Sequence, residues 1–193
     1  METDTEKPTI IDRILAKTIL PLVPKIVTPN HITAFRLAAT PFVIYFLSAG
    51  EFKWGLVLFV IAAFSDALDG ALARVRGPIT DWGKMYDPLA DKFLIGSVAA
   101  LAVARLLGQW LALTIIALEL FIIVNAFWMR RYRHVEIKAK LVGKIKMILQ
   151  SVGVGLLLLF SVVGGGPLLS VAFYVLVASV FFSILSLIVY RSI

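Results

Sequence analysis

Residues Ser65–Lys92, SDALDGALARVRGPITDWGKMYDPLADK, place four of the chain's aspartates at the facing ends of two long apolar segments. These aspartates are Asp66, Asp69, Asp87 and Asp91. An ionised carboxylate within a membrane is costly, and such residues usually have a functional role. This stretch therefore constrains the fold class and also indicates where the chemistry of the protein lies.

The composition of the whole chain predicts an integral membrane protein. Of its 193 residues 60% are hydrophobic and 16% are charged, and its mean hydropathy is +0.94. A soluble domain has about half apolar and about a quarter charged residues. The net charge of +7 suits either nucleic acid or anionic lipid, and the long apolar segments favour lipid, so no nucleic-acid partner is expected. The absence of cysteine excludes disulfides and thiolate metal sites.

Six apolar stretches predict six transmembrane helices, since a helix needs about 20 residues to cross the hydrocarbon core. They are Ile32–Ala49, Trp54–Val75, Met85–Leu107, Trp110–Met129, Leu141–Val163 and Leu168–Tyr190. The second and third qualify only if their aspartates are counted as intramembrane or interfacial. Apolar residues at helical spacing in Ile10–Ile19 predict an amphipathic interfacial helix, the alternative being a solvated arm. Residues 1–193 then form one all-α integral membrane domain, with 1–29 as a cytoplasmic or interfacial arm.

The distribution of basic residues predicts the orientation of these spans. Lysine and arginine gather before the first span, in the loops after the second and fourth, and after the sixth, whereas the other loops carry only Lys53 and Arg105. Basic loops usually stay on the cytoplasmic side. A multi-pass protein of the cell membrane is therefore expected, with both termini and the aspartate stretch in the cytoplasm.

The spacing of the aspartates predicts a cation site. Asp66 and Asp69 are three residues apart, and Asp87 and Asp91 are four apart, so each pair shares one face of a helix. A Gly-Pro pair between them turns the chain, so both faces can meet at one point. Four carboxylates there repel each other and need positive charge, which Mg²⁺, Mn²⁺ or Ca²⁺ can supply. The alternative is a set of helix-end salt bridges with basic neighbours such as Arg74.

The surrounding residues resemble a known family. Gly70, Ala73 and Gly83 leave room for a ligand, and Arg74 can hold a phosphate through two hydrogen bonds. From Asp66 the pattern D-x2-D-G-x2-A-R-x8-G-x3-D-x3-D resembles the signature of the CDP-alcohol phosphotransferases. This resemblance implies a six-span membrane enzyme, generally a homodimer. Such an enzyme transfers a phosphatidyl or similar phospho-group from a CDP-linked donor to an alcohol and releases CMP.

The resemblance also implies roles for individual residues. The metal ligands, for two Mg²⁺ or Mn²⁺ ions, are Asp66, Asp69, Asp87 and Asp91. The catalytic base that deprotonates the acceptor is Asp91. The residues of the CDP-donor site are Asn30, Thr33, Gly70, Ala73, Arg74, Thr80 and Gly83. Asn30 and Thr33 lie at the start of the first span, so capping of the helix is an equal alternative for them. Arg36, one turn further into this span, is harder to explain by structure alone.

The acceptor alcohol is suggested by a narrower resemblance. Tyr86–Lys92 is similar to the phosphatidylglycerophosphate synthase and cardiolipin synthase branches. Val142–Gln150 is similar to the first of these, which implies CDP-diacylglycerol as donor and sn-glycerol 3-phosphate as acceptor. A phosphorylated acceptor needs cations near the metals, and the candidates for binding it are Lys144, Lys146 and Arg130.

Other interpretations remain open. Phe127 and Met147 stand where the glycerophosphate branch commonly has arginine and threonine. These departures leave room for a cardiolipin-synthase-like enzyme that uses phosphatidylglycerol, or for an acceptor such as inositol phosphate. A cation-binding transporter is an alternative from another class. It would spread acids over several spans, whereas here Glu119 is the only acid within a span outside the aspartate stretch.

Overall fold

The computed structural model describes residues 24, 27–76, 81–133 and 141–191. Within these ranges the backbone alone is described for residues 67, 69–71, 73–76, 81–88, 126–127, 129–133 and 189–191. The predicted interfacial helix Ile10–Ile19 lies outside the described residues, as does Thr80.

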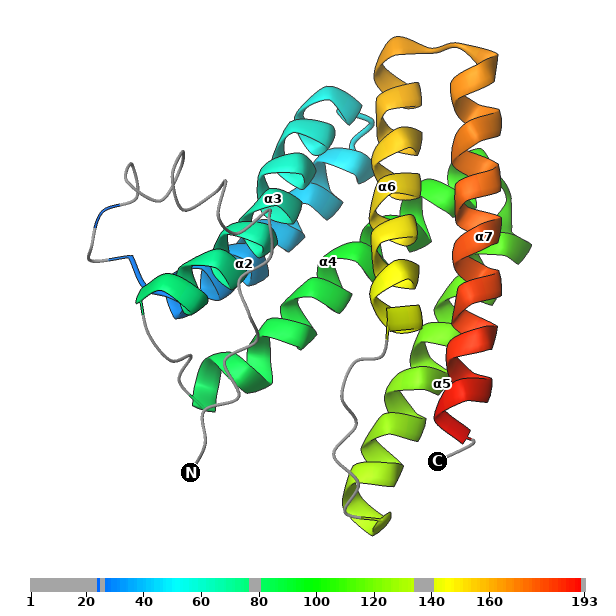
Figure 1. The fold of residues 1–193 in the computed structure, drawn as a ribbon. Helices are drawn as coiled ribbons and strands as arrows, with labels where there is room; N and C mark the ends of the chain where they lie inside the picture. The colour runs from blue at the N-terminus through cyan, green and yellow to red at the C-terminus, as the bar shows by residue number, and fades with distance from the viewer. Residues whose placement is uncertain (1–23, 25–26, 77–80, 134–140, 192–193) are drawn as a thin grey trace. The chain divides into compact units, whose positions relative to one another are not determined.

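The described part of the chain consists of α-helices and contains no strand, which confirms the all-α prediction (Figure 1). The helices are α2 (Pro29–Ser48), α3 (Phe52–Arg76), α4 (Asp81–Leu106), α5 (Gln109–Arg133), α6 (Leu141–Val163) and α7 (Gly166–Arg191). Each coincides with one of the predicted spans. The largest differences are at α4, which begins at Asp81 instead of Met85, and at α5, which ends at Arg133 instead of Met129.

Helices α2, α4 and α6 end at glycines where the chain turns sharply. Gly50 follows α2 with φ of 84°, and Gly108 follows α4 with φ of 109°. Gly164 and Gly165, between α6 and α7, have φ of 77° and 99°. Residues with a side chain rarely adopt such values, so glycine ends α2, α4 and α6 without strain.

Three helices in the described residues are long and apolar enough to cross a membrane: Pro29–Ser48, Leu141–Val163 and Gly166–Ile188. A shorter apolar helix covers Gln109–Asn125. These segments support a membrane protein. They do not test the full prediction of six spans, because parts of α3, α4 and α5 have no described side chains.

The chain divides into two compact units. The first comprises the described part of Met1–Val43 together with Val57–Leu94, so it holds the start of α2, most of α3 and the start of α4. All the predicted metal ligands and the predicted donor-site residues that the structure describes belong to this unit. Its buried apolar side chains are Ala39, Val43, Phe59, Ala62, Leu72, Ala90 and Leu94.

The second unit comprises Ile44–Leu56 and Ile95–Ile193. Its helices α6 and α7 pack side by side as a hairpin (Figure 1). Gly153 allows this close approach, since a Cβ atom there would lie 2.7 Å from the side chain of Leu176. Arg105 donates hydrogen bonds to the carbonyls of Leu47, at 2.7 Å, and Ser48, at 3.2 Å. A cation at these last carbonyls stabilises the C-terminus of α2.

Candidate active site

Helices α3 and α4 carry the four predicted metal ligands. Both are continuous over these positions, so Asp66 and Asp69 lie on one face of α3 and Asp87 and Asp91 on one face of α4. The face-sharing geometry expected from the spacing is therefore present in the backbone. The side chains of Asp69 and Asp87 are outside the described set.

Asp66 forms an ion pair with Arg36 of α2. The Arg36 Nη1 atom lies 3.0 Å from Oδ1 of Asp66. The two side chains differ in environment, because that of Arg36 is 0% exposed and that of Asp66 is 45% exposed. The carboxylate therefore lies at the boundary between the buried guanidinium and the surroundings of the protein.

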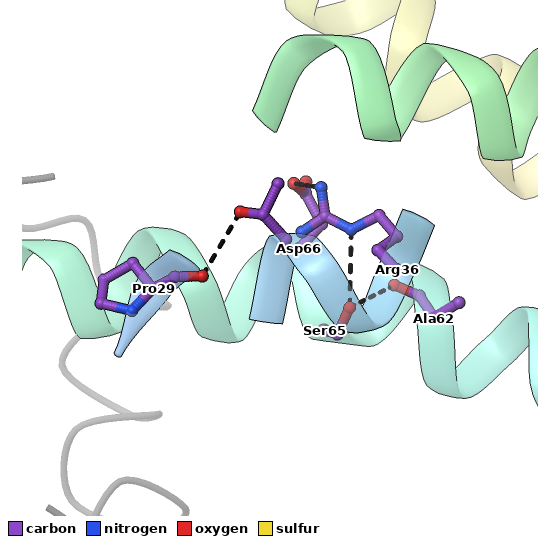
Figure 2. A network of polar contacts seen from close by, with 6 residues as sticks. Pro29, Arg36, Ala62, Ser65 and Asp66 are labelled. Carbon is purple, nitrogen blue, oxygen red and sulfur yellow. Dashed lines mark hydrogen bonds and ion pairs between the residues drawn. The ribbon is translucent and has the colours of Figure 1, made fainter. Parts of the chain in front are cut away.

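Ser65 extends this contact into a short polar network. Its hydroxyl accepts a hydrogen bond from Nε of Arg36 at 3.5 Å and donates one to the carbonyl of Ala62 at 2.6 Å. Figure 2 shows Arg36 from α2 directed toward the neighbouring residues Ser65 and Asp66 of α3. The guanidinium thus connects α2 with the start of the aspartate-bearing face of α3.

Asp91, the predicted base, is buried with 6% of its surface exposed. Its environment differs from that of Asp66, although both residues lie in the first unit. A buried carboxylate needs hydrogen bonds or positive charge to stay ionised. This requirement is consistent with a cation site at this end of α4.

The described side chains contain no group of three or more acidic, histidine or cysteine residues that would complete a metal site. Of the four predicted ligands, only Asp66 and Asp91 have described side chains. Both supply carboxylate oxygens, which hard divalent cations prefer. The donor chemistry therefore fits Mg²⁺ or Mn²⁺, and no coordination geometry is described.

Two predicted donor-site residues lie in the first two turns of α2. The helix begins at Pro29, and Thr28 precedes it with its hydroxyl 3.2 Å from Nδ1 of His31. Asn30 and Thr33 are therefore inside the helix. The hydroxyl of Thr33, which is buried, donates to the carbonyl of Pro29 at 3.3 Å. The capping alternative is wrong for Thr33, because the helix already begins at Pro29, four residues before it.

The remaining donor-site candidates belong to backbone-only or undescribed positions. Gly70, Ala73 and Arg74 lie in the last turns of α3, and Gly83 lies in the first turn of α4. Thr80 falls in the connection between the two helices, outside the described residues. Their assignment rests on sequence spacing.

The acceptor-site candidates belong to the second unit. Lys146 of α6 is buried and forms an ion pair with Glu119 of α5, with Nζ 2.5 Å from Oε1. Lys144, two residues earlier, is exposed. Arg130 lies in the last turns of α5, where only the backbone is described. Lys146 therefore has an acidic partner, and the side chain of Lys144 is exposed.

The two interhelical ion pairs were not predicted from the sequence. Arg36 and Glu119 stand out as charges in apolar stretches, which indicates that each needs a partner. The sequence does not identify the partner, because Asp66 and Lys146 are distant in the chain. Asp66 pairs with Arg36. The side chain of Arg74 lies outside the described set, so the alternative of a salt bridge between the aspartates and a basic neighbour stays a prediction.

Comparison with known proteins relates this arrangement to an enzyme family. A model of the family described as CDP-alcohol phosphatidyltransferase matches residues 26–185, a range that includes Arg36 and the aspartate stretch. The CDP-diacylglycerol–glycerol-3-phosphate 3-phosphatidyltransferase of Rickettsia felis is 30% identical over 136 residues, covering 69% of this chain and 75% of that protein.

Two further relatives differ in the reaction that their names describe. A probable phosphatidylglycerophosphate synthase of Mycobacterium tuberculosis is 32% identical over 166 residues, covering 81% of this chain and 76% of that protein. A CMP-forming cardiolipin synthase of Streptomyces coelicolor is 29% identical over 123 residues, covering 60% of this chain and 57% of that protein.

Proposed function

Because this chain belongs to the CDP-alcohol phosphatidyltransferase family, we propose that it transfers a phosphatidyl group from CDP-diacylglycerol to sn-glycerol 3-phosphate and releases CMP. The observation that carries this proposal is the pair of continuous helices bearing Asp66, Asp69, Asp87 and Asp91, within the matched range. The relatives named for glycerol 3-phosphate transfer support this acceptor.

The reaction is a displacement at phosphorus. The acceptor hydroxyl forms a new oxygen–phosphorus bond to the phosphate that carries diacylglycerol. The bond between that phosphorus and the bridging oxygen breaks, and CMP leaves with this oxygen. Asp91 takes the hydroxyl proton, and a buried carboxylate suits this role because a base must contact the nucleophile away from bulk water.

Four carboxylates can hold the divalent cations on which the family generally depends. We propose two Mg²⁺ or Mn²⁺ ions, held by Asp66, Asp69, Asp87 and Asp91. When bound, they supply positive charge that offsets the charge developing on the phosphate oxygens. The described oxygen donors, Asp66 at the surface and Asp91 in the interior, are compatible with this set.

The donor site is proposed on both sides of the connection between α3 and α4 and at the start of α2. It comprises Asn30, Thr33, Gly70, Ala73, Arg74, Thr80 and Gly83. The start of α2 supports this proposal, since Asn30 and Thr33 both lie within its first two turns. Thr33 is buried, and a role as helix cap does not account for it.

The acceptor phosphate is proposed to bind Lys144, Lys146 and Arg130. Exposed Lys144 can meet a phosphate directly. Lys146 would have to bind the phosphate while it is paired with Glu119, or give up that ion pair. Lys144 is therefore the preferred candidate of the three.

We also propose the domain organisation, the membrane topology and the oligomeric state of the protein. One continuous match over residues 26–185 supports a single functional domain. Six helices at the predicted positions support six spans, with both termini and the aspartates in the cytoplasm because of the basic loops. A homodimer is proposed from the family resemblance.

A second acceptor has specific support. The cardiolipin synthase of Streptomyces coelicolor is almost as similar to this chain as the relatives named for glycerol 3-phosphate transfer. Phosphatidylglycerol is therefore the second candidate acceptor. Both candidates use the same donor, so they differ in the acceptor site alone.

The test is release of CMP by the purified protein from CDP-diacylglycerol and Mg²⁺, with a panel of acceptors. The panel contains sn-glycerol 3-phosphate, phosphatidylglycerol, inositol 1-phosphate, inositol and serine. Release that depends on sn-glycerol 3-phosphate and is lost in Asp91→Asn supports the proposal. Release with phosphatidylglycerol alone would replace it by the cardiolipin reaction, and release with no acceptor while the donor binds would refute both acceptors.

A further inference from the structure

Arg36 is a buried charge that the proposed reaction does not use. Its side chain is 0% exposed, in a helix apolar enough to span a membrane. A buried charge is tolerated only with a partner and hydrogen bonds. Well-packed apolar side chains are often as stabilising as a buried ion pair. Stability of the fold is therefore a poor explanation for an arginine at this position.

Two contacts of Arg36 are made to successive residues of α3. Its Nη1 atom pairs with Asp66 at 3.0 Å, and its Nε atom donates to Ser65 at 3.5 Å. Ser65 is itself directed by its hydrogen bond to the carbonyl of Ala62. Because a guanidinium is planar and rigid, contacts through two of its nitrogens fix the direction from which it meets the carboxylate.

Burial changes along this network. Arg36 and Ser65 are 0% and 7% exposed, whereas the side chain of Asp66 is 45% exposed. The restraint on the carboxylate thus comes from the protein interior. The carboxylate itself remains accessible to a ligand from outside.

We propose that Arg36 is a positioning residue, which holds the Asp66 carboxylate in the orientation in which it binds a divalent cation. This inference rests on the proposed role of Asp66 as a metal ligand. Groups that hydrogen-bond to a metal ligand set its direction, and their loss typically lowers metal affinity by about 10–100-fold.

The sign of the change in affinity separates this role from simple charge compensation. A guanidinium repels a nearby cation, so the loss of its charge alone would strengthen cation binding. The loss of orientation would weaken it. A weaker affinity after removal of Arg36 can therefore come only from lost positioning in a folded protein.

The experiment measures Mn²⁺ binding to the full-length protein in detergent, without substrates, from the electron paramagnetic resonance signal of free Mn²⁺. Arg36→Met should weaken binding by about 10–100-fold. Arg36→Lys should weaken it less, because the ammonium group can still donate a hydrogen bond to the carboxylate, although it offers no planar fork. The matched control is Arg105→Met, which removes an arginine that also contacts α2 but meets only backbone carbonyls. It should leave the affinity unchanged.

Unchanged or tighter binding in Arg36→Met would overturn the inference. Adding Arg36→Met to Asp66→Asn should cause no further loss, since the two residues act through one carboxylate. If Arg36→Met does not fold, as judged by circular dichroism, Arg36→Lys decides, and equal affinity to the wild type overturns the inference. If the wild type itself binds no Mn²⁺, the proposed metal-ligand role fails instead.

Discussion

Removal of Glu119 tests the buried ion pair of the second unit. In Glu119→Leu the ammonium group of Lys146, 5% exposed, would lose the carboxylate whose Oε1 lies 2.5 Å from its Nζ. Removing one member of a buried pair typically costs about 3–5 kcal/mol, because the other charge stays buried without compensation. At about 2–4 °C per kcal/mol for a chain of this size, the unfolding midpoint should fall by about 6–20 °C.

The reverse change should cost less. In Lys146→Met the remaining Glu119 side chain is 16% exposed, so its carboxylate can keep part of its hydration. The double variant Glu119→Leu/Lys146→Met removes both charges and should recover most of the loss, since a packed apolar pair is often as stable as the ion pair. The two single effects are therefore expected to be strongly non-additive.

The assay is thermal unfolding in detergent, followed by the fluorescence of the four tryptophans at one fixed scan rate. A fixed rate is needed because such unfolding is commonly irreversible. Lys53→Met, which removes an exposed lysine, is the matched control and should leave the midpoint unchanged. A Glu119→Leu midpoint equal to the wild type, or additive effects in the double variant, would refute the buried pair.

The double variant also bears on function. If it folds and keeps the wild-type KM for sn-glycerol 3-phosphate, Lys146 serves the packing of α5 and α6 and not the acceptor. Lys144 and Arg130 would then remain as the cations proposed to bind the phosphate.

Four further predictions concern the proposed active site. Asp91→Asn should lower turnover by at least about 10²–10⁴-fold, the usual contribution of a general base, while some Mn²⁺ binding persists; normal turnover would exclude Asp91 as the base. Asp66→Asn should lose Mn²⁺ affinity and activity together, and EDTA should inactivate the wild type until Mg²⁺ or Mn²⁺ is added; activity in excess EDTA would contradict a metal-dependent reaction. Lys144→Ala should raise the KM for sn-glycerol 3-phosphate by roughly 10–100-fold, as expected for the loss of a charge-assisted hydrogen bond, with little change in donor affinity. An unchanged KM would remove Lys144 from the acceptor site.

The helices of this protein were predictable because they depend on local properties of the chain. Apolar runs of sufficient length, ended by residues such as Gly50 and Gly108, located each helix to within a few residues. The two ends that were missed, at Asp81 and Arg133, are polar extensions beyond the apolar runs. Hydropathy identifies the membrane-spanning part of a helix, but it does not show how many polar turns continue beyond that part.

At the start of α2, the residue types alone predict the wrong helix boundary. Asn30 and Thr33 have the residue types of helix caps, yet the helix already begins at Pro29. Proline is well suited to the first helical position, because its φ is preset and its missing amide hydrogen is not needed there. Attention to Pro29 would have corrected the boundary from the sequence alone.

The sequence by itself determined the helical membrane character, the spacing of the four aspartates and membership of the family, because each depends on neighbouring residues or on a fixed pattern. Only the tertiary structure decided that Arg36 meets Asp66 and that Lys146 meets Glu119. A charge in an apolar stretch shows that a partner is needed. The identity of that partner depends on which helix faces pack together, and side chains distant in the chain become neighbours only through that packing.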